Sequence, residues 1–176
     1  MTIRRFYGTW QFFNDQLVDA VRNLTDEQLR VQRTAPDAWP VWATIGHTAG
    51  TRVYWLCSVL HEPGWEVTPF DPSQEEGWED HLETPRGSHE LVHALTTTWS
   101  IVDACLERWT PDMLGEAIER HIGGRTQLHT REAILMRMIS HEAYHCGELS
   151  LTLATHDLPQ IDLWPPRPMW GSPDAV

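Results

Sequence analysis

The segment from about Thr130 to His156 constrains the fold more than any other part of this sequence. It contains neither proline nor glycine between Arg131 and Cys146. Apolar residues recur along it at the three- and four-residue spacing of one helix face. Thr130 is a suitable N-cap, and Pro159 follows the last periodic residues. The segment therefore predicts a long amphipathic helix.

Three further stretches carry the same periodicity, over about Thr2–Asn23, Val41–His61 and Ser88–Trp109. Short helical turns are expected after Thr25, which opens a capping box with Gln28, and at Pro111, which suits the first position of a helix. The stretch from Glu116 to Leu128 contains Gly123-Gly124 and predicts either a small hairpin or an irregular loop.

Four long helices predict an all-α fold, an antiparallel four-helix bundle with long crossover loops. A length of 176 residues favours a single domain, 1–176, with a tail rich in proline and tryptophan over 157–176. The long connection Glu62–Gly87 is expected to be a surface loop with one helical turn near Glu75. Gly46 and Gly50 lower the helix propensity of the second segment and indicate close packing there.

Charge and composition exclude several classes of function. The formal net charge is −12 and no basic run is present, which argues against binding to nucleic acid or to an anionic membrane surface. The apolar stretches are too short to span a bilayer, and no signal peptide is expected. The three cysteines are far apart and imply no disulfide framework. A cytoplasmic protein with a small-molecule substrate is the simplest expectation.

The strongest functional signal is the pair His141 and His145, four residues apart within the last helix. Two imidazoles at this spacing project from the same face, one turn apart, and can hold one divalent metal. A helical wheel places them at the border of the apolar face, where helical bundles build internal metal sites.

A metal site needs at least one more ligand, since catalytic zinc takes three protein ligands and keeps one position open. His47 is the best candidate, because it lies in the middle of the second helix among small and apolar residues. An open position on the metal polarises a carbonyl or lowers the pKa of a bound nucleophile. Three imidazoles suit several metals, among which zinc or nickel is expected.

The run His141-Glu142-Ala143-Tyr144-His145-Cys146-Gly147-Glu148-Leu149 resembles the last-helix signature of the DinB-like (DinB/YfiT-type) family of metal-dependent enzymes. That signature has two histidines separated by three residues, often followed by Gly-Gln-Leu, and an earlier histidine in the second helix, as His47 is here. The resemblance covers most of the chain. The chain departs from the signature at Glu148, where the family usually has glutamine.

The resemblance implies that His47, His141 and His145 are the metal ligands. It also implies a four-helix bundle that forms a homodimer, and chemistry such as transfer or isomerisation that uses a low-molecular-weight thiol. Catalytic residues beyond the ligands stay unknown, and whether the protein is an enzyme, as a transferase or a hydrolase, stays open.

Two other functions remain open at this stage. The same residues match His-Glu-x-x-His, in which Glu142 would be the general base of a metal-dependent hydrolase or protease. Glu142 could instead orient a ligand imidazole. The third possibility is a non-catalytic metal-binding or sensing module. Cys146 is expected to be a core residue, and no role is assigned to the other histidines, although His121 and His129 precede the last helix.

Overall fold

The computed structural model describes residues 1–74, 76–162 and 164. Its long helices are α1 (Gly8–Arg22), α3 (Val41–Val53), α4 (Ser88–Arg108) and α6 (Arg131–Thr155), and its short ones are α2 (Asp26–Leu29) and α5 (Pro111–Leu114). The described chain is mostly helical, as predicted. The expected turn at Glu75 and most of the 157–176 tail fall outside the described residues.

The helix ends follow the capping signals in the sequence. The hydroxyl of Thr25 accepts a hydrogen bond from the backbone N–H of Gln28 at 3.2 Å, and the Gln28 side chain accepts one from the backbone N–H of Thr25. Thr130 caps α6 through the N–H of Ala133. At α4 the first residue of the periodic stretch, Ser88, is already helical, and Gly87 before it is the N-cap, with its N–H bonded to the carboxylate of Glu90.

The first helix is shorter than its apolar stripe suggested. Residues Arg4–Phe6 form a separate 3-10 turn, and the regular helix begins only at Gly8. As a result Phe6 is exposed, whereas Ile3, which lies outside the predicted stripe, is buried beside Trp109 with its N–H bonded to the Trp109 carbonyl. A change of backbone geometry before the helix has shifted the buried face.

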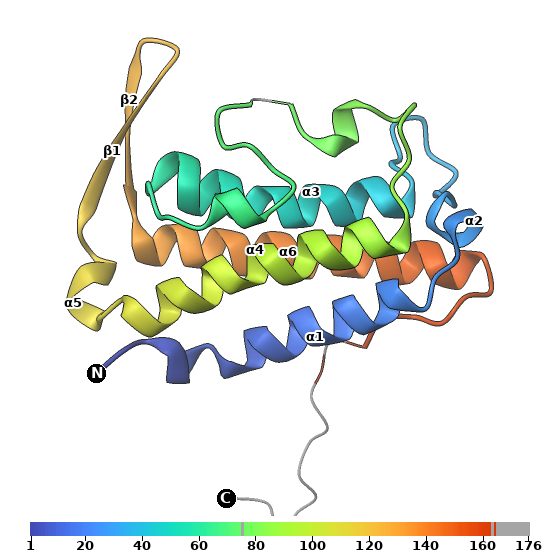
Figure 1. Cartoon of the computed structure of the whole chain (residues 1–176), viewed down its shortest axis with the longest axis horizontal. Coiled ribbons are helices and arrows are strands. Elements are labelled where there is room, and N and C mark those ends of the chain that lie inside the picture. Colours follow the sequence, from blue (N-terminus) through green and yellow to red (C-terminus); the bar gives the residue numbers. More distant parts are fainter. Residues whose placement is uncertain (75, 163, 165–176) are drawn as a thin grey trace, which may run out of the picture.

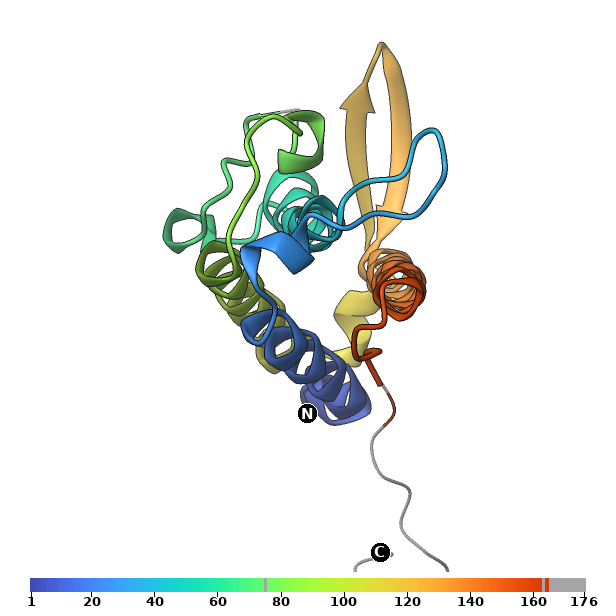
Figure 2. The ribbon, with the colours of Figure 1, turned by 90° about the vertical axis from the view of Figure 1, so that its right-hand side faces the viewer.

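The all-α prediction omitted a two-stranded antiparallel sheet, β1 (Ala117–Ile122) and β2 (Arg125–Thr130). Gly123 and Gly124 both have positive φ, at 54° and 73°, which a tight two-residue hairpin turn requires and glycine adopts without strain. The hairpin projects from the start of α6 (Figures 1 and 2). Of the two structures expected for this stretch, a small hairpin or an irregular loop, the hairpin is present, and it forms one wall of a cavity.

Helices α3 and α4 run in the same direction, and α1 and α6 run opposite to them (Figure 1). The long connection after α3 makes this possible, because it carries the chain back across α3 before α4 begins. This connection packs on the two glycines of α3. A methyl group at Gly46 would lie 3.0 Å from the ring of Trp78, and one at Gly50 would lie 3.3 Å from Phe70. The expected close packing at these glycines is confirmed.

A buried polar layer divides the core into two apolar clusters. On each long helix one polar residue lies between members of the two clusters: Asn14 in α1, Arg52 in α3, Thr98 in α4 and Glu142 in α6. Arg52 donates to Glu142, to Asn14 and to Thr98. Because all four side chains are buried and joined, this layer fixes the relative positions of the helices that carry the site.

At the end of α3 the helix changes to a π-helical segment, Tyr54–Val59. Within this segment the rings of Tyr54 and Trp55 pack edge to face, with their centroids 5.1 Å apart. Such segments are frequent at functional sites. No helix in the described part of the chain combines the length and the apolar character that a membrane span requires.

Candidate metal centre

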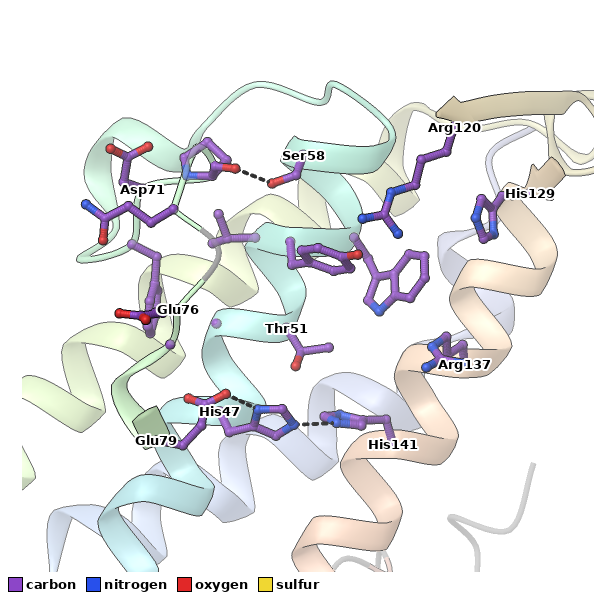
Figure 3. A pocket seen from close by; sticks show the side chains of 18 of the residues that line it. His47, Thr51, Ser58, Asp71, Glu76, Glu79, Arg120, His129, Arg137 and His141 are labelled. Carbon is purple, nitrogen blue, oxygen red and sulfur yellow. Dashed lines mark hydrogen bonds and ion pairs between the residues drawn. The ribbon is translucent and has the colours of Figure 1, made fainter. Parts of the chain in front are cut away.

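Three histidines from two helices meet at one point of the structure. His47 comes from α3, and His141 and His145 lie one turn apart on α6 (Figure 3 shows the first two). The Nε2 atom of His141 is 2.9 Å from Nε2 of His47 and 3.1 Å from Nε2 of His145. One ligand atom from each ring lies within 4.8 Å of the others. The proximity predicted for residue 47 and the later pair is therefore present.

The outer nitrogens of two of these rings are held by carboxylates. Glu79, in the long connection, contacts Nδ1 of His47, and Glu148 contacts Nδ1 of His145 at 2.7 Å. Since a carboxylate only accepts hydrogen bonds, each Nδ1 carries the proton. In the neutral ring Nε2 is then left with a lone pair. Both lone pairs point toward the third imidazole.

This donor set fits a divalent metal. Of the three Nε2 atoms that face one another, only that of His141 can carry a proton, because His47 and His145 carry theirs on Nδ1. One proton cannot fill both contacts, whereas a cation between the three atoms would accept all three lone pairs. A tetrahedral zinc ion holds its nitrogen ligands about 3.3 Å apart, close to the two measured separations. In addition, the buried Nδ1 of His141 has no hydrogen-bond partner among the described residues. Metal binding by these residues stays a prediction.

The electrostatic environment keeps the rings on α6 neutral, the form that binds metals. Burial lowers the pKa of His141 to about 4, with further contributions from the neighbouring His145, His47 and Arg137. Burial also lowers the pKa of His145, against the opposing effect of its hydrogen bond to Glu148. Metal ligands must be deprotonated, so both shifts favour metal binding at neutral pH.

Aromatic and charged neighbours cover the cluster on its other side. The indole of Trp39 lies 4.9 Å from the ring of His47 and stacks on His145 at 6.3 Å. The second oxygen of Glu148 accepts a hydrogen bond from Arg33 at 2.7 Å. Tyr144 is mostly exposed, although its ring lies 5.2 Å from that of His145.

Glu142 does not take part in the cluster. Its two carboxylate oxygens accept hydrogen bonds from Nε of Arg52 and from the indole N–H of Trp10, both at 2.7 Å, inside the core. Glu142 therefore cannot act as a general base for metal-bound water, and it cannot orient a ligand imidazole. The structure thus disfavours the His-Glu-x-x-His interpretation and assigns Glu142 to the polar layer of the core.

The cysteines are not candidates for the site. All three are free and buried. Burial raises the pKa of Cys57 to about 11 and those of Cys105 and Cys146 to about 12. They remain protonated at neutral pH and are weak nucleophiles. The expectation that Cys146 is a core residue is confirmed.

A cavity of about 900 Å³ opens beside His47 and His141. The long connection forms one side of it and the hairpin the other, with α3 and the π-helical segment between them (Figure 3). His129 lines this cavity from the hairpin, whereas His121 is exposed and bonded to Thr126. The volume suits a small molecule.

Sequence analysis missed part of the surroundings of the histidines. The role of Glu148 was left open, although a residue three positions after His145 shares its helix face. No sequence pattern links Glu79 to His47, which lies 32 residues earlier. Trp39 was likewise unassigned, because contacts between loops and helices follow from tertiary packing.

Comparison with known proteins supports the fold described above. The family model of the DinB superfamily matches residues 10–149. The crystal structure of a DinB-like protein from Bacillus cereus aligns with a TM-score of 0.62 and 19% sequence identity, covering 93% of this chain and 98% of that one. At this identity the alignment supports the fold alone. No curated protein matches significantly.

Proposed function

Because this chain belongs to the DinB superfamily and brings three imidazoles together between α3 and α6, we propose that it is a metal-dependent enzyme acting on a small molecule. His47, His141 and His145 are the proposed ligands of one divalent ion, zinc or nickel. The observation that carries the proposal is the convergence of three Nε2 atoms while carboxylates hold the outer nitrogens of two of the rings.

The proposed reaction is a transfer or isomerisation assisted by a low-molecular-weight thiol. A divalent metal in an open site lowers the pKa of a bound thiol, which supplies a nucleophile at neutral pH. The chain's own cysteines do not serve, since all are buried and protonated. The thiol therefore comes from outside and enters through the cavity beside His47 and His141.

The residues around the ligands have defined parts in this proposal. Glu79 and Glu148 fix the tautomer and orientation of two rings, which raises their basicity as ligands. Trp39 covers the side of the cluster away from the cavity and limits the access of water. Hydrolysis with Glu142 as base is not supported, because both of its oxygens are engaged in the core.

Metal analysis of protein purified without an affinity tag tests the proposal. About one equivalent of metal is expected, and it is expected to be lost in His47→Ala, His141→Ala and His145→Ala. Turnover of a set of small electrophiles, with and without added thiol, then separates a thiol-dependent enzyme from a hydrolase. Metal binding without any turnover would support a sensing module, and absence of metal binding would overturn the proposal.

We also propose that the four long helices make one four-helix bundle in a single domain and that the protein is a homodimer. The dimer is supported by three exposed apolar side chains on one face of α6: Met136 at 68%, Tyr144 at 66% and Leu151 at 64% exposure. Sedimentation of the native protein and of the Leu151→Glu variant tests this, with a shift from dimer to monomer expected. A native monomer would contradict it.

A further inference from the structure

Two arginines line the cavity next to the histidine cluster. Arg120 reaches in from β1, and Arg137 lies on α6 one turn before His141 (Figure 3). Four residues of helix correspond to about 6 Å along the axis. A ligand of a few bonded atoms can therefore extend from the histidines to the guanidinium of Arg137.

Both guanidinium groups are held by aromatic rings from the π-helical segment. Arg120 lies over Tyr54, 5.0 Å from its centroid, and Arg137 lies over Trp55 at 5.1 Å. Stacking occupies the face of a guanidinium and leaves its N–H edges free to donate. The stacking contacts thus hold the two arginines in place and leave their N–H groups available to a ligand.

Neither arginine has a carboxylate partner within ion-pair distance among the described residues. Most other described arginines pair with an acid: Arg4, Arg22, Arg33, Arg52, Arg86, Arg108 and Arg131. Arg5, Arg30 and Arg125 also have no such partner, but they are exposed and lie outside the cavity. Unpaired guanidinium groups in a cavity are typical of sites that bind carboxylate or phosphate.

The acids that line the cavity lie on its opposite side, and none is within ion-pair distance of Arg120 or Arg137. Asp71 accepts two hydrogen bonds from Ser73, Glu76 pairs with His81, and Glu79 contacts His47. The cavity therefore has a positive wall formed by the hairpin and α6, and a wall of engaged acids formed by the long connection (Figure 3).

We propose that Arg120 and Arg137 bind an oxyanion group, a carboxylate or a phosphate, on the molecule whose reacting end lies at the histidine cluster. The substrate or thiol of this protein is accordingly a small anion. This inference rests on the proposed function for the position of the reacting end, but the anion subsite itself can be measured separately.

The test uses protein loaded with Co²⁺, whose absorption reports a bound thiolate. Three thiols of similar size are titrated: 3-mercaptopropionate, 2-mercaptoethylphosphonate and the neutral 3-mercaptopropionamide. At least one anionic thiol is expected to bind about tenfold tighter than the amide, the value of one good charge-assisted hydrogen bond. Comparison of the affinities of the carboxylate thiol and the phosphonate thiol identifies which oxyanion the site prefers.

Arg120→Gln is expected to abolish the preference for the anionic thiol and leave the affinity of the amide unchanged. Arg120 has no contact with the histidines, so metal content should be retained. Arg137→Gln should also abolish the preference. Arg125→Gln, on the same hairpin but outside the cavity, is the matched control and should keep it. Equal binding of anionic and neutral thiols by the native protein, or equal effects of Arg120→Gln and Arg125→Gln, would overturn the inference.

A second titration separates this inference from the proposed function. Succinate and inorganic phosphate are titrated calorimetrically into metal-free native protein and into its Arg120→Gln variant. Binding that depends on Arg120 in a protein that takes up no metal would support the anion subsite and overturn the metal proposal. If the protein takes up metal but shows no preference for anions in the thiol titration or in this one, the metal proposal would be supported and the anion subsite overturned.

Discussion

Two polar clusters join α3 and α6, and they differ in how their groups are satisfied. In the core, Arg52 and Glu142 are 1% and 5% exposed, and they bond to each other and to Asn14 and Trp10. In the second cluster, Nε2 of His141 faces the Nε2 atoms of His47 and His145, and a single proton cannot lie in both contacts at once. In the first cluster both carboxylate oxygens of Glu142 have donors, and one terminal nitrogen of Arg52 is left without a partner among the described residues. In the second, the Nε2 atoms that face one another share at most one proton, and a cation would satisfy them.

This contrast indicates different roles for neighbouring residues. His141 and Glu142 are adjacent in sequence and about 100° apart around the helix, so one faces the cavity and the other the core. The core cluster contributes to the positions of the helices, and the histidine cluster is available to a ligand. Substitutions in the two clusters should therefore affect different measurements.

The largest effect is expected for Glu142→Ala. It leaves the Arg52 guanidinium buried without its carboxylate, which should lower the free energy of unfolding by about 3–5 kcal/mol. Urea denaturation of metal-free protein measures this. The double variant Arg52→Met with Glu142→Leu serves as control and should recover most of the loss, because it removes both charges. A loss below about 1 kcal/mol for Glu142→Ala would show that the core cluster does not hold the helices.

The second effect concerns metal affinity. His141→Ala should weaken metal binding by more than the roughly 10–100-fold typical of residues that only support ligands. In the metal-free protein its stability should stay within about 1 kcal/mol of native, because Nδ1 of this ring has no hydrogen-bond partner among the described residues and its Nε2 faces two imidazoles with at most one shared proton. Competition with a chromophoric chelator gives the affinity. His121→Ala, on the exposed hairpin, is the control and should bind metal normally.

A smaller loss is expected from the carboxylate that orients His145. Glu148→Ala should weaken metal binding about 10–100-fold, since Nδ1 of the ring loses its acceptor. Glu148→Gln keeps an acceptor oxygen and should cost less. The same chelator competition measures both variants. Equal affinities in the two variants would mean that Glu148 acts by its charge and not by the hydrogen bond.

The smallest effect is a dependence of stability on pH. The pKa of His141 is lowered to about 4 in the folded protein from an ordinary value of 6.5, so the unfolded chain takes up the proton first. Stability of the metal-free protein should therefore fall as the pH decreases from 6.5 toward 4. Urea denaturation at pH 7.5, 6 and 5 should show a smaller decrease in His141→Gln. An identical decrease in both proteins would contradict this assignment.

The helices and the histidines were accessible from sequence for a simple reason. Apolar spacing and capping residues are local signals, and they predicted the long helices and the caps at Thr25 and Thr130. The spacing of His141 and His145 is also local, and it fixes their shared face. His47 required a further assumption, that its helix packs against the last one, and the structure brings the two helices together there.

The cavity was not predictable in the same way. Its walls come from the hairpin and from the connection between α3 and α4, and these are placed by contacts between residues far apart in sequence. Glycines on α3 gave the one hint, since they leave room for Phe70 and Trp78. The positions of Arg120 and Arg137 depend on the π-helical segment and on the hairpin, neither of which has a local pattern of comparable strength.

The three imidazoles lie on regular helices, whereas most of the cavity wall lies on a hairpin and a long connection. Helix-borne groups keep their spacing when surface segments change length or composition, because surface segments tolerate such changes. The proposed metal ligands are thus carried by different segments from most of the cavity wall, although Glu79 and Arg137 cross this division. An engineer could graft a different hairpin onto the same helices, and so change the molecule that the cavity accepts without moving the three histidines.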